Sequence, residues 1–179
     1  MKQRTIARTI EIVGIGLHKG VPVKMKLEPL DSDMGIIFYR VDAGVTIPLK
    51  KEFVVDTKMA TVIGKDGVVV STIEHLLSAV YAYGIDNLRI VIDNDEVPVL
   101  DGSSAGYCML IEEAGIKELE KSKKAIKIKK MVEVTTPEGK RVCLKPSNRI
   151  VYDFEIKFEH PAIGKQKFHF DYSISEYKE

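Results

Sequence analysis

The sequence has no excess of charge of either sign. It contains 27 basic and 26 acidic side chains, and neither half of the chain carries a basic stripe that could follow a phosphate backbone. This balance argues against nucleic acid as a partner. At 179 residues, the chain is long enough to bury a core and to hold one large domain or two small ones.

Long apolar runs are also missing. No uninterrupted apolar segment approaches the ~20 residues that a transmembrane helix needs. The first residues, MKQRTIARTIEIVG, alternate polar and apolar side chains where a signal peptide would have a continuous apolar stretch. We therefore expect a soluble, cytoplasmic protein with no transmembrane segment.

Cysteine is scarce. Cys108 and Cys143 lie far apart and belong to no Cys-x-x-Cys pair, which excludes a zinc ribbon and a disulfide framework. We expect both to be reduced, buried thiols.

Alternation of polar and apolar residues predicts strands over much of the chain. Val23, Met25 and Leu27 share one face of such a segment, while Lys24 and Lys26 take the other. The segment GIGLHKG lacks the helix that a phosphate-binding loop needs, so it is interpreted as a hairpin turn. The turn residues Asn94-Asp95 predict a second hairpin, which returns through Val97 and Val99. The predicted strands are residues 5–13, 21–27, 35–39, 60–63, 67–70, 88–92, 126–134, 141–144, 151–158 and 167–172.

Two helices interrupt this strand-rich pattern. The first begins at Ser71, ends at Gly84 and carries an apolar stripe; the second follows Ser103 or Ser104 and ends at Gly115. The charged residues 117–124, KELEKSKK, are interpreted as a linker, after which we expect strands without a helix. Leu27-Glu28-Pro29 and Leu144-Lys145-Pro146 end comparable strands in the two halves, which favours a repeated unit whose second copy is incomplete. The stripe residues of the first helix are Ile73, Leu76, Leu77, Val80 and Tyr81.

The pair Glu74-His75 at the start of the first helix has two interpretations. Ser71 and Glu74 fit a capping box, in which the glutamate serves the helix end only. Alternatively, the pair is chemical, because His75 falls among small residues on the side of the helix opposite the stripe, where an exposed helix would carry long charged side chains. Those small residues are Ser71, Ser78, Ala79 and Ala82. The protease motif His-x-x-Glu-His is excluded, since Ser71 stands where its first histidine would be.

Several motifs, in order and spacing, closely resemble the UDP-3-O-acyl-N-acetylglucosamine deacetylases, a family of zinc enzymes in the lipid A biosynthesis of Gram-negative bacteria. The resemblance extends from the first residues to residues 160–163, almost the whole chain. The motifs are GIGLHKG at residues 14–20, STIEHLLSA at 71–79, GIDN at 84–87 and EVPVLDGS at 96–103.

The resemblance implies a hydrolase that removes the N-acetyl group of a UDP-sugar acyl substrate. It implies that Glu74 is the general base and that His75 is a zinc ligand. It also implies that His18, and Thr57 and Met59 of the segment DTKMAT, bind substrate. The implied fold class is α+β, with two similar sheet-plus-two-helix domains that face each other. We place the first domain at residues 1–122 and the opening strands of the second at residues 123–179.

The chain also departs from the family. The other two zinc ligands of the family lie in a His-x-x-x-Asp motif on a second-domain helix, and this motif is not found up to Glu179. The chain therefore resembles a C-terminally truncated member, with the remaining ligands expected beyond residue 179. The alternative to an enzyme is a non-catalytic fragment that binds a sugar nucleotide or a protein partner. Truncation of the second domain is also expected to favour self-association.

Overall fold

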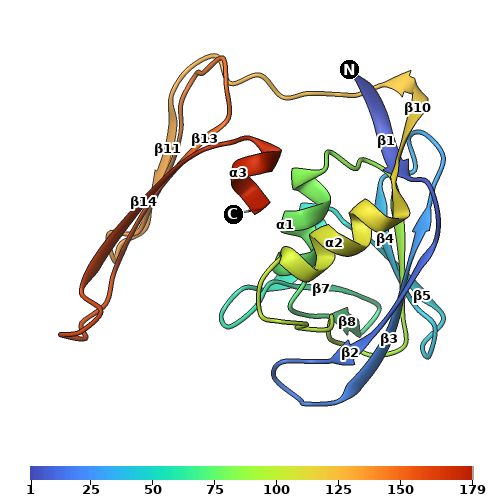
Figure 1. The fold of residues 1–179 in the computed structure, drawn as a ribbon. Coiled ribbons are helices and arrows are strands. Elements are labelled where there is room, and N and C mark those ends of the chain that lie inside the picture. The colour runs from blue at the N-terminus through green and yellow to red at the C-terminus, as the bar shows by residue number, and fades with distance from the viewer. Residues whose placement is uncertain (179) are drawn as a thin grey trace. The chain divides into compact units, whose positions relative to one another are not determined.

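A computed structural model describes residues 1–178 of the chain, which divides into two compact units, Met1–Lys123 and Lys124–Glu179 (Figure 1). Strands predominate and helices are few, so the predicted α+β class is confirmed. That the second unit begins a domain similar to the first stays a prediction.

A five-stranded sheet forms the centre of the first unit. Its strand order is β2-β3-β9-β4-β5, and β9 pairs antiparallel with β3 but parallel with β4. Its strands are β2 (Ile10–Ile15), β3 (Pro22–Pro29), β4 (Ile36–Arg40), β5 (Val45–Pro48) and β9 (Leu88–Ile92).

One face of this sheet is the core. The predicted alternation is confirmed in β3, where Val23, Met25 and Leu27 are buried, and in β9, where Leu88 and Ile90 are buried. Helices α1 (Glu74–Ala82) and α2 (Ala105–Ala114) pack against each other on the same side of the sheet (Figure 1). The helices contribute Leu76, Val80, Tyr107 and Ile111 to the core.

The buried face of α1 is not quite the predicted stripe. Tyr81 is 56% exposed, whereas Ala79 and Ala82 are buried. The two alanines were predicted to lie on the opposite side of the helix, among the small residues. Helix α2 packs against α1, and small side chains allow two helices to approach closely. The buried surface of α1 is therefore wider than the predicted stripe and includes the two alanines.

Several predicted segments differ in the structure, among them the predicted strand 126–134, in which residues 126–131 are not strand. Residues 5–13 are two strands, β1 (Lys2–Ile6) and β2, rather than one. The predicted linker contains a strand, β10 (Ile116–Ser122), which pairs antiparallel with β1 and buries Leu119. The prediction of a second hairpin is wrong, because residues 93–99 form only isolated bridges, such as that between Gly16 and Pro98.

A smaller sheet precedes α1. It consists of β6 (Val54–Asp56), β7 (Val62–Lys65) and β8 (Val68–Val70), and a short 3-10 helix, η1 (Lys51–Phe53), leads into it. The loop 57–61 joins β6 to β7 and contains most of the segment DTKMAT.

The second unit contains two antiparallel hairpins, β11 with β12 and β13 with β14. A helix of five residues follows, contrary to the prediction that none would. The elements are β11 (Val132–Thr135), β12 (Arg141–Leu144), β13 (Val151–Lys157), β14 (Lys165–Asp171) and α3 (Ile174–Lys178).

Within residues 1–178, no helix has the length and apolar character needed to cross a membrane. Neither cysteine forms a disulfide bond, and the prediction that both are buried is confirmed for one of them only. Cys108 is buried, and Cys143 is only half-buried.

Candidate active site at the start of helix α1

Glu74 and His75 are the first two residues of α1, and the predicted capping box is wrong. Ser71 does not cap the helix, because the residue at the capping position is Ile73 and no side chain bonds there. The Ser71 amide instead donates to the backbone oxygen of Asp95. Thr72, which lies between Ser71 and Ile73, adopts a left-handed backbone conformation, with φ of 55°. The chain therefore turns sharply into the helix and leaves the Glu74 carboxylate free of a capping role.

The Glu74 carboxylate faces the loop that ends the segment DTKMAT. The backbone N–H of Thr61 donates to Glu74 Oε2 at 3.1 Å and lies 3.4 Å from Oε1. The side chain is half-buried, so this contact holds the carboxylate in place while leaving part of it open. A carboxylate held in this way can accept a proton from a bound reactant.

His75 is held from the other side by the loop before α2. The hydroxyl of Ser104 donates to the backbone oxygen of His75 at 2.9 Å. The neighbouring Asp101 accepts hydrogen bonds from the amide and hydroxyl of Ser103. These bonds lower the pKa of Asp101, and attraction to His75 adds a smaller lowering.

His18 lies in the turn after β2 and is part of a buried network around Glu96. Its Nδ1 lies 2.7 Å from Glu96 Oε1, and its backbone N–H donates to the same carboxylate at 3.0 Å. The hydroxyl of Thr72 donates to Glu96 at 2.9 Å, and the amide of Lys19 donates at 3.3 Å. Thr72 is two residues before Glu74, so this network links His18 to the start of α1.

The hydrogen bonds determine the charge state of Glu96. Burial by itself raises the pKa of this carboxyl, but the bonds from His18, Thr72 and Lys19 lower it more, so the pKa lies below its ordinary value. The carboxylate is therefore ionised and acts only as an acceptor. Sequence patterns assigned no role to Glu96, Thr61 or Asp101, because their contacts join segments that only the tertiary fold brings together.

The remaining predicted site residues are in the loop 57–61. Thr57 and Met59 are both exposed, Met59 at 83%, and the amide of Thr57 bonds to its neighbour Asp56. The structure thus brings Thr61 of this loop to Glu74 and leaves Thr57 and Met59 open to solvent. In the second unit, His169 pairs with Asp153 across the hairpin at 2.6 Å, on an exposed face.

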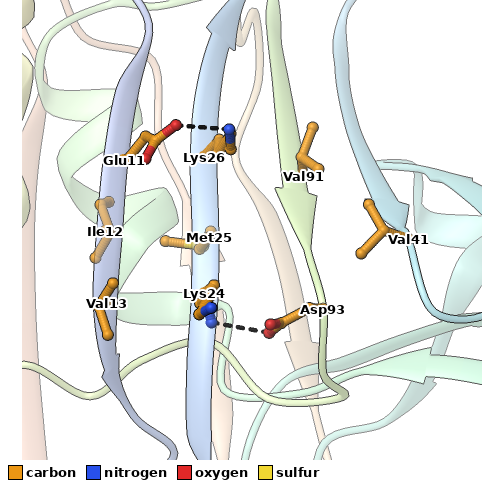
Figure 2. A pocket seen from close by; sticks show the side chains of 9 residues that line it. All are labelled: Glu11, Ile12, Val13, Lys24, Met25, Lys26, Val41, Val91 and Asp93. Atoms are coloured by element: carbon orange, nitrogen blue, oxygen red, sulfur yellow. Dashed lines mark hydrogen bonds and ion pairs between the residues drawn. The ribbon is translucent and has the colours of Figure 1, made fainter.

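A hollow on the five-stranded sheet is formed by other residues (Figure 2). Lys26 Nζ lies 2.6 Å from Glu11 across this hollow, and the Asp93 carboxylate accepts from the backbone N–H of Lys24 at 2.8 Å. The lining residues are Glu11, Ile12, Val13, Lys24, Met25, Lys26, Val41, Val91 and Asp93.

The residues at the start of α1 fit a catalytic zinc ion only in part. Such an ion usually takes three protein ligands. Nowhere in the described part of the chain do three His, Cys, Asp or Glu side chains come together in a metal-binding group. His75 can supply one imidazole ligand, so the chain fits a contribution to a metal site but not a whole one.

Comparisons with known proteins agree with the motifs. Residues 3–179 match the family described as LpxC, UDP-3-O-acyl N-acetylglycosamine deacetylase. The chain is 89% identical over 178 residues to the UDP-3-O-acyl-N-acetylglucosamine deacetylase of Aliarcobacter butzleri (strain RM4018), covering 99% of this chain and 59% of the relative. It is 63% identical to the protein of the same name from Nautilia profundicola, covering all of this chain and 61% of the relative. For Helicobacter pylori (strain J99 / ATCC 700824) the identity is 59%, over all of this chain and 60% of the relative. The chain thus spans about three fifths of the length of these relatives.

Proposed function

The chain belongs to the UDP-3-O-acyl-N-acetylglucosamine deacetylase family, and from this premise we propose that the whole protein is a zinc-dependent deacetylase of lipid A biosynthesis that acts in the cytoplasm. Its substrate is a UDP-3-O-acyl-N-acetylglucosamine, whose N-acetyl amide is hydrolysed. In this proposal, the 179 residues of this chain supply the general base, one metal ligand and part of the substrate-binding surface. The ligands that complete the metal site belong to the remaining two fifths of the length of the relatives.

Glu74 is the general base in this proposal. Water attacks the acetyl carbon, the amide C–N bond breaks, and the amine leaves with a proton while acetate is released. Glu74 removes the proton from the attacking water, and the Thr61 amide holds its carboxylate during this transfer. The observation that carries the proposal is that this carboxylate bonds to a loop amide and makes no helix cap.

His75 is the metal ligand in this proposal. Zinc, when bound, supplies polarisation of the acetyl carbonyl and makes water more acidic. The chain's own contribution is to fix the imidazole: His75 lies in the first turn of α1, and the Ser104 hydroxyl ties its backbone to the loop before α2.

His18, Thr57 and Met59 contact the substrate in this proposal. His18 is joined to the start of α1 through Glu96 and Thr72, and the loop 57–61 contacts Glu74 through Thr61. Both segments are therefore connected by hydrogen bonds to the helix that carries the base.

The substitution Glu74→Gln in the full-length protein tests the proposal. Glutamine keeps the size of the side chain and can still accept from Thr61, but it cannot take a proton, so deacetylation should fall by about 10²- to 10⁴-fold. Folding and bound zinc should be retained, as measured by circular dichroism and metal analysis. The matched control is Glu113→Gln, on the exposed side of α2, which should keep normal turnover. Near-normal activity of the Glu74→Gln protein would remove Glu74 from the mechanism.

A further inference from the structure

A buried carboxylate of the first unit, that of Glu96, has several hydrogen-bond donors, although the resemblance gave this residue no role in the chemistry. Glu96 is 2% exposed and accepts from the amides of His18 and Lys19, from the Thr72 hydroxyl and from the His18 imidazole. A buried charge is costly unless it is paired and hydrogen-bonded, and here every one of these donors meets that need. The residue therefore has a fixed position that a surface glutamate lacks.

The surrounding backbone is shaped to accept this carboxylate. A Cβ atom placed on Gly16 would lie 2.5 Å from Glu96 Oε2, so only glycine leaves room for the carboxylate at this point of the turn. On the other side, Thr72 takes its left-handed conformation and directs its hydroxyl to Glu96. Left-handed backbone is costly for a β-branched residue, and the hydrogen bond offsets that cost.

The same geometry determines which nitrogen of His18 carries the proton. Nδ1 lies 2.7 Å from Glu96 Oε1, and an ionised carboxylate can only accept a hydrogen bond. The proton must therefore be on Nδ1. The His18 side chain is 39% exposed, so the imidazole has one nitrogen committed to the buried carboxylate and the other available outside.

We propose that Glu96 is a positioning residue that locks His18 in its Nδ1-protonated form and thereby presents an unprotonated Nε2 to a hydroxyl group of the sugar nucleotide. The inference rests on the proposed function of His18 in binding substrate. It adds that Glu96 orients His18. It also adds that Nε2 is the nitrogen that contacts the ligand and that this nitrogen accepts a hydrogen bond from a hydroxyl group. Free imidazole prefers the opposite tautomer only weakly, so a single short bond to a carboxylate is sufficient to reverse it.

Glu96 also connects His18 with the base. The amide of Val97 donates to the Ser71 oxygen and the amide of Ser71 donates to Asp95, so residues 95–97 hold the chain just before α1. The Thr72 hydroxyl adds a side-chain link to the same carboxylate. One buried residue thus sets the position of the His18 turn and of the entry to the helix that begins with Glu74.

The direct test is the protonation state of the imidazole in the full-length protein. Two-bond nitrogen–proton correlation NMR on histidine-labelled protein distinguishes the two nitrogens, and it is recorded at about pH 9, where an ordinary imidazole is neutral. His18, assigned by its loss in His18→Gln, should show a protonated Nδ1 and an unprotonated Nε2. In Glu96→Gln, whose amide cannot satisfy all four donors, the Nε2-protonated form should become the main one.

Two matched variants separate this effect from loss of charge or of structure. Asp95→Asn removes the neighbouring carboxylate, which pairs with Lys19, and should leave the His18 tautomer unchanged. Glu96→Asp keeps the charge but shortens the reach by one methylene, and should shift the tautomer as Glu96→Gln does. If neither Glu96 variant folds, the spectrum of the unaltered protein still decides, because an Nε2-protonated His18 there overturns the proposal.

Kinetics then distinguish this inference from the proposed function. Glu96→Gln should raise KM for the sugar nucleotide by about tenfold, the usual effect of one lost hydrogen bond, with a smaller change in kcat. His18→Gln should raise KM by a similar factor. An unchanged KM in His18→Gln would remove His18 from substrate binding, whatever its tautomer. An unchanged tautomer in Glu96→Gln would overturn the positioning role, even if KM rises.

Discussion

Two glutamates of the first unit show how the surroundings of a carboxylate determine its use. Glu74 is half-buried and has one amide donor, from Thr61, which leaves it able to receive a proton. Glu96 is buried and its oxygens are surrounded by donors, which keeps it ionised and unreactive. The first suits a base and the second suits a fixed support.

The depressed pKa of Glu96 predicts a pH dependence of stability. Because the folded-state pKa lies below the ordinary value of 4.5, the ionised carboxylate stabilises the fold fully above that value. This stabilisation is lost as the pH falls through the folded-state pKa. The free energy of unfolding of the unaltered protein should therefore approach that of Glu96→Gln as the pH is lowered from about 7 to about 3.

Denaturant unfolding at a series of pH values measures this difference. The control is again Glu113→Gln, whose stability should follow that of the unaltered protein at every pH. A gap between the unaltered protein and Glu96→Gln that stays constant over the whole range would contradict the assigned pKa direction.

At this scale, sequence patterns singled out the residues that are proposed to carry the chemistry but not those that hold them. Glu74 and His75 were recognisable because they are adjacent and lie in a distinctive motif. Glu96 and Thr61 act through partners that are 78 and 13 residues away, respectively. Only the tertiary fold makes such pairs, so no local pattern could have shown them.

The elements next to the site give a prediction about helix ends. Ser71 does not cap α1, so Ser71→Ala should change the free energy of unfolding by less than about 0.5 kcal/mol, below the range of a true cap. Ser104→Ala removes the hydroxyl that donates to His75 and should cost about 1 kcal/mol. Urea unfolding of the two variants measures both values, and a larger loss in Ser71→Ala than in Ser104→Ala would restore the capping box.

Among the strands, those with strict alternation and a deep core were predictable. Strands β3 and β9 bury every second residue, as their patterns indicated. Strand β10 was missed because it is one of only two strands in its sheet and buries Leu119 alone, so its sequence is charged on both faces. The predicted second hairpin does not form, because Pro98 has no N–H to donate to a strand partner and because the Glu96 side chain is buried.

On the scale of the whole chain, the second unit exposes much of its apolar surface. Val134 pairs with Val142 across one hairpin, and Phe154 pairs with Phe168 across the other. These four side chains are 57% to 70% exposed, which is unusual for neighbours on one sheet face. Hairpins of this kind gain stability when a further layer covers them.

We therefore expect the 179-residue chain to self-associate. Sedimentation should show dimers or larger species whose proportion rises with protein concentration. The double variant Val142→Ser, Phe168→Ser should reduce this association, whereas Lys167→Ser, at a neighbouring position of β14, should not. A stable monomer at all concentrations would contradict the prediction.

The same chain is expected to hold zinc only weakly and to lack measurable deacetylase activity. His75 alone cannot retain the ion against water and buffer, and no group of three metal-binding side chains occurs among residues 1–178. The measurement is metal analysis after dialysis against zinc-free buffer, together with an acetate-release assay. One equivalent of zinc that is lost in His75→Ala, with turnover, would show that a complete site forms elsewhere, for example between copies of the chain.

The central position of β9 has a consequence for synthesis on the ribosome. In the five-stranded sheet β9 is the last strand along the chain, yet it lies between β3 and β4 and joins two hairpins that precede it. Until residue 92 has left the exit tunnel, the nascent chain therefore has two separate ribbons, each with an uncovered apolar face. During this interval the strand edges that β9 later covers are open to pairing with the wrong partners.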